Sequence, residues 1–433
     1  MFFYGVRAGA RNAGEQEIMM RQIIRSGFIK ILVATIFSVQ LAACDDDGSS
    51  GASAVADGGN IAILASDVVV SGSVGDGPVT GAIIAVYSKT GKLIGVTTSD
   101  TTASFQHTFK VKGKEYPLLL EVNGGVDLVT GVEPDFQMLS VMMRPSDRQV
   151  NINPFSTLVV MIAQSLPGGI NSGNVNQAKD FVTDKLGFGL DLNVVSDPIT
   201  ATINESNVSN LVKSSEALGE MVRRTRDRIT EAGTVLSGDD VMAAIAADMT
   251  DGVLDGVGGA GTDARLSAVA NVVSGQVLVE ALSNSLKVGG VVATAAIDEA
   301  IAITNAQIAS SHLTGSVRVT QGMLKQARVA LAAAKVLDAS DPVIDINNTV
   351  GSIVPDVLPQ EVAAVLPADA SSTLDYAVVL SPTADETQIS AINEVVSSDG
   401  SAGTADVNAV PTINGSPAAS VTANNGYVFQ PIA

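Results

Sequence analysis

The sequence predicts a multidomain chain in which a small antiparallel β-sandwich is followed by an α-helical domain and an incomplete β segment. Short alternating or β-branched runs between Gly and Pro turns occupy the first part. Apolar residues at three- and four-residue spacing occupy the middle. The chain has 433 residues and a hydrophobic content of 46%, which is enough for more than one core.

The first 43 residues have the pattern of an export signal. Three basic residues lie between positions 21 and 30, and residues 31–39 form an apolar stretch too short to span a bilayer. The sequence Leu41-Ala-Ala-Cys44, which contains the only cysteine, resembles the lipobox of bacterial lipoproteins. The resemblance implies cleavage before Cys44 and a thioether-linked diacylglycerol on its thiol. The alternative is a small apolar residue at the end of a core helix.

Residues 44–66 are expected to form a flexible acidic tether, because three aspartates followed by Gly and Ser cannot bury apolar surface. Acidic residues at this place resemble lipoprotein sorting signals, which act at the inner membrane in some bacteria and direct export to the surface in others. We therefore expect a protein of the bacterial cell envelope that is anchored in the inner or the outer membrane through the lipid on Cys44. Translation begins at Met1 or near Met20.

Charge and composition limit the other partners. The formal net charge of −20 repels nucleic acid and anionic headgroups, so no nucleic-acid partner is expected, whereas cations such as calcium are attracted. An aromatic content of 4% leaves few rings for stacking on sugars. A protein or a cell surface is the partner that remains.

Residues for catalysis are scarce. The two histidines, His107 and His312, lie far apart and outside any His-Glu-x-x-His motif, and the single cysteine is assigned to lipidation. Gly-x-Ser-x-Gly and phosphate-loop motifs are absent from the sequence. We therefore predict no catalytic residues and no enzymatic activity. His107 is expected to face outward on a strand.

The predicted β-sandwich spans residues 67–148. Its strands are expected at 68–70, 82–87, 93–98, 104–111 and 118–122. The stretch Val70-Ser-Gly-Ser-Val-Gly-Asp-Gly-Pro-Val-Thr-Gly-Ala82 and the turn around Asp100 resemble the carboxypeptidase-regulatory, prealbumin-like family, with Ala103 where the family has glycine. The resemblance implies a module that accompanies catalytic domains or stands in surface proteins and has no catalytic residues of its own.

The predicted α-helical domain spans residues 149–339. It opens with an Asn-Pro-Phe-Ser-Thr-Leu segment, with Ser156 or Thr157 in the first turn, which resembles the Asn-Pro-Leu-Thr-Thr-Leu segment that often follows prealbumin-like modules in bacterial lipoproteins. After this first helix, further helices are expected at 175–186, 208–232, 238–247, 264–286, 290–309 and 319–337.

Two charged clusters lie in this domain. The first has four arginines at 223, 224, 226 and 228, with Glu216, Glu220 and Glu231 at ion-pairing intervals. We expect solvated pairs on a helix surface, and a phosphate or partner site is the alternative.

The second cluster is a Gly-rich acidic loop at 248–263. Asp248, Asp251, Asp255 and Asp263 supply the carboxylates that calcium prefers, although their spacing differs from an EF-hand. Asp-Gly turns and a helix cap at Asp263 account for the same residues, and we favour that interpretation.

The remaining sequence is less regular. Residues 340–409 form a connector rich in Pro, Ser and Asp. Residues 410–433, from Val-Pro-Thr-Ile-Asn-Gly-Ser-Pro to Gly-Tyr-Val-Phe-Gln-Pro, resemble the opening strands of bacterial Ig-like repeats. Two or three strands are marginal alone, so we expect a truncated repeat or pairing with another chain.

Two functions are compatible with these features. The favoured one is a non-catalytic cell-envelope lipoprotein that acts as a surface scaffold or adhesion-type module. The alternative is a ligand-binding or enzymatic lipoprotein with a cation site in the loop 248–263.

Overall fold

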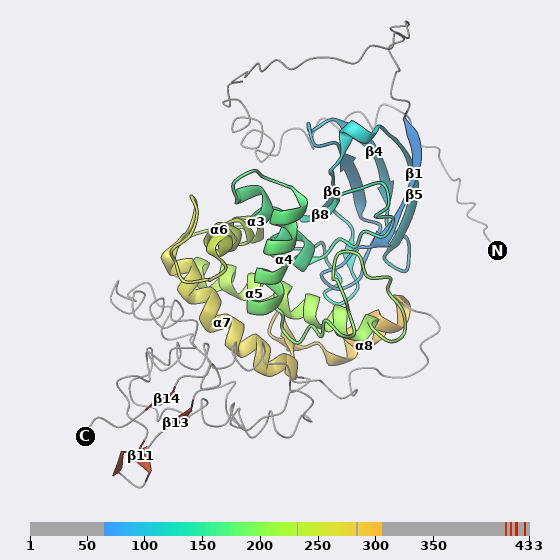
Figure 1. The fold of residues 1–433 in the computed structure, drawn as a ribbon. Helices are drawn as coiled ribbons and strands as arrows, with labels where there is room; N and C mark the ends of the chain where they lie inside the picture. Colours follow the sequence, from blue (N-terminus) through green and yellow to red (C-terminus); the bar gives the residue numbers. More distant parts are fainter. Residues whose placement is uncertain are drawn as a thin grey trace, which may run out of the picture. The chain divides into compact units, whose positions relative to one another are not determined.

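The computed structural model describes residues 65–304, except 232, 283 and 284, together with four two-residue strands between 412 and 429. A β region is followed by helices, as the sequence predicts (Figure 1). Several predicted features lie outside the described residues: the signal peptide, Cys44, nearly all of the tether, His312, the helix at 319–337 and the connector 340–409.

The β region consists of antiparallel pairs. The principal sheet has four strands in the order β4 (Leu93–Thr98), β3 (Ile83–Tyr87), β6 (Leu118–Asn123) and β8 (Met138–Met142). Two further pairs join β1 (Ser66–Ser73) to β5 (Ser104–Val111), and β2 (Val79–Thr80) to β7 (Val126–Asp127). All five predicted strands are present. Their arrangement as a sandwich stays a prediction.

Strand β8 was not predicted from the sequence. The pattern Met-Leu-Ser-Val-Met does not alternate, and four of its five residues are buried. Helix α3 (Pro154–Ser165) packs against this strand, whose residues are buried on both faces, so the usual alternation is lost.

The linker between the last strand and α3 runs along β1. Bridges join Ser71 to Gln149 and Val74 to Ile152 in parallel register. The two backbones approach so closely at Gly72 that a Cβ there would lie 1.9 Å from the Val150 carbonyl oxygen. Glycine is therefore required at this position of β1.

In the described part of the chain, five more α-helices follow α3. They are α4 (Ser172–Lys185), α5 (Val208–Glu231), α6 (Gly238–Asp248), α7 (Ala264–Leu282) and α8 (Thr294–Thr304). Helices are thus confirmed in every described part where the sequence predicts one. The last begins later than expected, because a hairpin of β9 (Lys287–Val288) and β10 (Val291–Val292) turns through Gly289 and Gly290, which have φ of 57° and 83°.

The start of α3 joins the helices to the sheet. Asn153 accepts a hydrogen bond from Ser156 N at 2.8 Å, and Ser156 Oγ accepts one from Asn153 N at 2.9 Å. Ser156 also donates to the Leu139 carbonyl oxygen at 2.6 Å, and Thr157 Oγ1 accepts from Leu139 N at 3.0 Å. Ser156 therefore completes the helix cap with Asn153, and both Ser156 and Thr157 attach the helix to β8.

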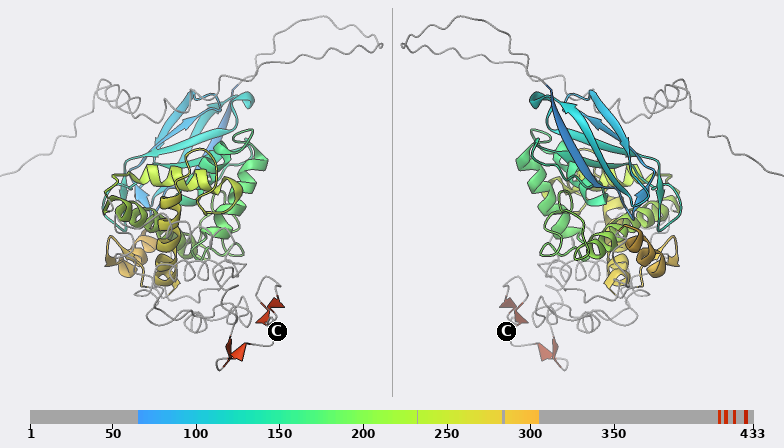
Figure 2. Two further views of the ribbon diagram at one scale, coloured as in Figure 1. Left: turned by 90° about the vertical axis from the view of Figure 1, so that its left-hand side faces the viewer. Right: turned by 90° about the vertical axis from the view of Figure 1, so that its right-hand side faces the viewer.

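The buried apolar side chains form one continuous core that runs from Val68 on β1 to Ile301 on α8. Figure 2 shows the strands as a layer on one side of the helices. The predicted boundary at 148/149 coincides with the change from strands to helices, but the core does not stop there. The sheet and the helices share their buried surface.

This shared core leads to a prediction for the isolated β region. A fragment of residues 67–148 should be unfolded, because it lacks α3, which covers β8. A fragment of residues 65–304 should fold. Amide dispersion in two-dimensional NMR spectra distinguishes the two states, and a well-dispersed spectrum of the short fragment would contradict the prediction.

Candidate functional site

A buried ion-pair network joins the β1–β2 loop to helix α5. The Arg223 side chain is 8% exposed, and it donates to Asp76 Oδ2 at 2.6 Å, Glu220 Oε2 at 2.8 Å and Glu216 Oε2 at 3.2 Å. The three carboxylate side chains are at most 2% exposed. The interpretation of these residues as solvated surface pairs is therefore wrong.

The reason for the error lies in the position of α5. This helix contacts α3, α6, α7 and α8, so most of its circumference is enclosed by other elements. Residues spaced by three and four positions share one face of a helix whether that face is exposed to solvent or buried. The pair of Arg228 with Glu231, at 3.0 Å, keeps the solvent-exposed character that the sequence predicts.

The network continues beyond Arg223. Arg224 donates to Glu220 Oε1 at 2.8 Å and to Glu280 Oε2 of α7 at 2.6 Å. It also donates to the Lys287 carbonyl oxygen of β9 at 2.6 Å. A separate arginine, Arg226, pairs with Asp135 of the β7–β8 connection. Helix α5 is thus tied by charged side chains to the β region, to α7 and to β9.

Two glycines allow the carboxylates to approach the backbone. A Cβ on Gly219, in the middle of α5, would lie 1.8 Å from Asp76 Oδ1. A Cβ on Gly77 would lie 2.3 Å from Glu216 Oε1 and 2.6 Å from Asp127 Oδ1. A glycine inside an otherwise regular helix is the sequence signal that could have revealed this close approach.

The network has more carboxylates than guanidinium groups near Arg223. Burial raises the pKa of Asp76 to about 7; Arg223 opposes the rise, and Asp127 and Asp135 add to it. Burial also raises the pKa of Glu216 well above its usual value, with Asp76 and Asp127 as further causes. Protons therefore neutralise part of the excess negative charge near neutral pH.

Asp76 and Glu216 each have one carboxylate oxygen without a hydrogen-bond partner among the described residues. Asp76 Oδ1 and Glu216 Oε1 are buried and make no hydrogen bond with any described residue. Each of these oxygens can therefore accept a proton without displacing a hydrogen-bond donor. This arrangement can bind and release protons, and it holds the sheet against α5.

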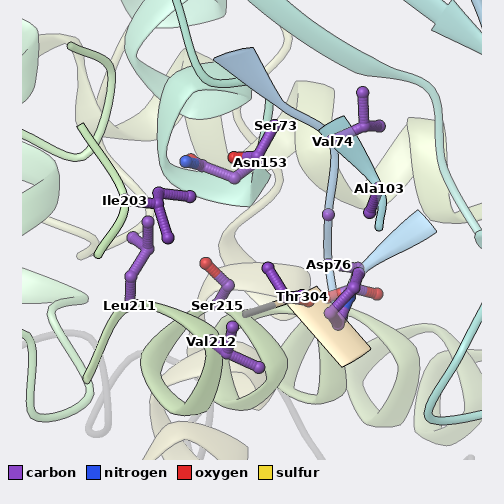
Figure 3. Close-up of a pocket in the computed structure, with 13 residues that line it drawn as sticks. Ser73, Val74, Asp76, Ala103, Asn153, Ile203, Leu211, Val212, Ser215 and Thr304 are labelled. Atoms are coloured by element: carbon purple, nitrogen blue, oxygen red, sulfur yellow. The ribbon is translucent and has the colours of Figure 1, made fainter. Parts of the chain in front are cut away.

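A small cavity adjoins Asp76 (Figure 3). Its volume is about 30 Å³, which is room for a water molecule. Leu211, Val212 and Ser215 of α5 lie on one side of it, and Ser73 and Asn153 lie on the other. The cavity is much smaller than the pockets of about 300 to 1,000 Å³ that hold small-molecule ligands.

The predicted acidic loop is built from turns and caps. Asp251 accepts from Val253 N at 3.0 Å, Asp255 from Val257 N at 2.9 Å, and Asp248 from Gly256 N at 2.9 Å. Asp263 caps α7 by accepting from Arg265 N at 2.9 Å and Leu266 N at 3.1 Å. These contacts are those of the favoured interpretation.

The calcium alternative gains no support from the described part of the chain, in which no three His, Cys, Asp or Glu side chains are grouped to hold a metal ion. Burial raises the pKa of Asp248 to about 6, with Asp255 and Asp251 adding to the rise and hydrogen bonds from Ser267 and Gly256 opposing it.

His107 is exposed on β5, as expected, with its ring centroid 4.6 Å from that of Phe109.

Comparison with protein-family models, curated proteins and solved structures finds no match to this chain. Among the described helices, none combines the length and apolar character needed to cross a membrane.

The close approach at Gly219 predicts the effect of a small substitution. Gly219→Ala should lower the free energy of unfolding by about 1 to 3 kcal/mol, because the new methyl group overlaps Asp76. Alanine would otherwise stabilise a helix interior by up to about 1 kcal/mol. Gly113→Ala is the control, because no atom lies within 4 Å of its new Cβ. Urea denaturation measures both variants, and a stabilised Gly219→Ala would contradict the contact.

The raised pKa of Asp76 predicts a pH dependence of stability. The folded carboxyl group binds its proton up to about pH 7, whereas the unfolded group loses it near pH 3.8. The contribution of Asp76 to stability is therefore greatest at the acid end of this window and falls as the pH rises through it, by on the order of 2 kcal/mol or more for a shift of this size. The shift of Glu216 acts in the same direction.

Urea denaturation between pH 4.5 and pH 8 measures this slope. Asp76→Asn should flatten it, since the amide does not titrate. Asp67→Asn is the control, because Asp67 forms an exposed pair with Lys110. The same slope in Asp76→Asn and the wild type would contradict the assignment.

Proposed function

We propose that the protein is a non-catalytic lipoprotein of the bacterial cell envelope, anchored through a diacylglycerol on Cys44 and acting as a surface scaffold or adhesion-type module. The observation that carries the scaffold role is the buried network around Arg223, which fastens the β region to the helices.

The contacts of the network support a rigid body. Proteins that close around a ligand use two parts that move about a hinge. Here the loop that carries Asp76 is held to α5 by a guanidinium buried with three carboxylates, and the core is continuous on both sides. A shift that separated Asp76 from Arg223 while both stay buried would leave charges without partners, which is costly. A unit built in this way suits a spacer or a presenting module.

The most strongly perturbed groups also support a structural role. Asp76, Glu216 and Arg223 are engaged with one another, and the adjoining cavity has room only for water. Groups with shifted pKa values mark functional sites when they face a cleft, but structural networks shift pKa values as well. The sealed position favours the structural explanation.

Two finer features of the fold belong to the same proposal. We propose a prealbumin-like sandwich for the β region, in which Ala103 occupies a left-handed turn with φ of 58° at the position where the family has glycine. We also propose an Ig-like segment at 410–433. Its support is the pairing of Thr412–Ile413 with Ser416–Pro417 and of Val421–Thr422 with Val428–Phe429.

Substitution of Cys44 tests the anchor. Cys44→Ser should leave an uncleaved or soluble precursor, because a hydroxyl group does not replace the thiol in lipid transfer. Metabolic labelling with a radioactive fatty acid and membrane fractionation measure the effect, and we expect at least a tenfold loss of label. Ser53→Ala, in the expected tether, is the control. Equal labelling of Cys44→Ser and the wild type would refute the lipoprotein assignment.

A further inference from the structure

A groove lies between helix α4 and the linker that joins β8 to α3. Its volume is about 630 Å³, within the range of ligand-binding pockets. Its walls come from three separate segments of the chain, at residues 141–149, 172–179 and 197–200. The groove shares no lining residue with the small cavity beside Asp76.

The groove carries an excess of positive charge in an acidic protein. Its lining includes Arg144, Arg148 and Lys179, against the two acids Asp147 and Asp197. The whole chain has a formal net charge of −20. Concave sites that concentrate one sign of charge attract ligands of the opposite sign. A ligand with negative charge is therefore indicated.

Two of the three cations remain available to such a ligand. Lys179 Nζ is already 2.9 Å from Asp197 Oδ2. The Arg144 side chain is 73% exposed and has a single long contact of 3.4 Å with Asp147 Oδ1. The Arg148 side chain is exposed and makes no ion pair or hydrogen bond with any described residue. Guanidinium groups with free N–H donors bind carboxylates in a bidentate manner.

The walls are fixed before any ligand arrives. Ser71 N donates to the Arg148 carbonyl oxygen at 2.8 Å, so this part of the linker is held along β1. Arg144 N donates to Asp147 Oδ2 at 3.0 Å and closes the turn between the two arginines. Asn151 N donates to the Ile199 carbonyl oxygen at 2.6 Å and holds the third wall. A preorganised site loses less conformational entropy on binding.

The other lining residues indicate the kind of anionic ligand. No aromatic ring lines the groove, so it has no surface for stacking a sugar or a base. The side chains of Ser172, Asn176 and Thr200 make no hydrogen bond with described residues and can meet peptide N–H and C=O groups. Met143 and Val175 provide apolar contacts that adapt to varied side chains.

We propose that this groove binds a short acidic peptide of a partner protein, with carboxylates on Arg144 and Arg148 and the peptide backbone along α4. The inference does not depend on the lipid anchor. It gives the scaffold a surface that recognises a partner.

Fluorescence anisotropy with the full-length protein tests the proposal. The probe is a fluorescein-labelled peptide Glu-Val-Glu-Val-Glu-Val, and the matching peptides with Gln or Lys in place of Glu report the need for negative charge. Arg148→Glu and Arg144→Glu should each weaken binding at least tenfold. Lys114→Glu changes the net charge by the same amount at an exposed position far from the groove in sequence, and it should change binding less than twofold.

Saturable binding of the Glu peptide, lost in both arginine variants and kept in Lys114→Glu, supports the proposal. No saturation up to millimolar peptide, or equal weakening in all three variants, would overturn it. Polygalacturonate, an acidic polysaccharide, tests whether the groove binds a saccharide instead of a peptide. If it binds with the arginine dependence and the Glu peptide does not, the peptide class is wrong. Circular dichroism spectra confirm that each variant is folded.

Discussion

The contact of Arg223 with three buried carboxylates is the interaction on which the joint between sheet and helices depends. Burying these charges is expensive, and only close, hydrogen-bonded geometry compensates for it. Each carboxylate meets one of the guanidinium nitrogens at 2.6 to 3.2 Å. Loss of one partner in such a buried set typically costs about 3 to 5 kcal/mol. The same geometry explains why Gly77 and Gly219 stand where the carboxylates touch the backbone.

Much of the fold follows from local patterns, but the burial of the network does not. Strand β6 alternates buried and half-buried residues, so its period is visible in the sequence. Helix α3 is readable from Pro154 and its polar cap. By contrast, the spacing of Glu216, Glu220 and Arg223 is the same on an exposed and on a buried helix face. Asp76 is 147 residues from Arg223, and no local pattern predicts that long-range contact.

The acidic loop and the groove show the same difference between local contacts, which the sequence reveals, and long-range contacts, which it does not. The Asp-Gly turns and the cap at Asp263 use contacts within a few residues, so sequence chemistry was sufficient to favour them. The groove combines Arg148 with α4 and with the turn around Asp197, which are separate in the chain. Its arginines were not singled out in the sequence because only the fold brings them beside α4.

Asn151 is one of the residues that connect the groove with the charged joint. Its side chain donates to the Ala201 carbonyl oxygen at 2.8 Å and accepts from Ser73 N at 3.3 Å and Gln149 Nε2 at 3.0 Å. Ser73 ends the strand that leads to Asp76, and Gln149 follows Arg148. A shift of the β1–β2 loop would therefore move the backbone that presents Arg148. The rigidity supplied by Arg223 thus also holds the groove in the geometry that a carboxylate ligand requires.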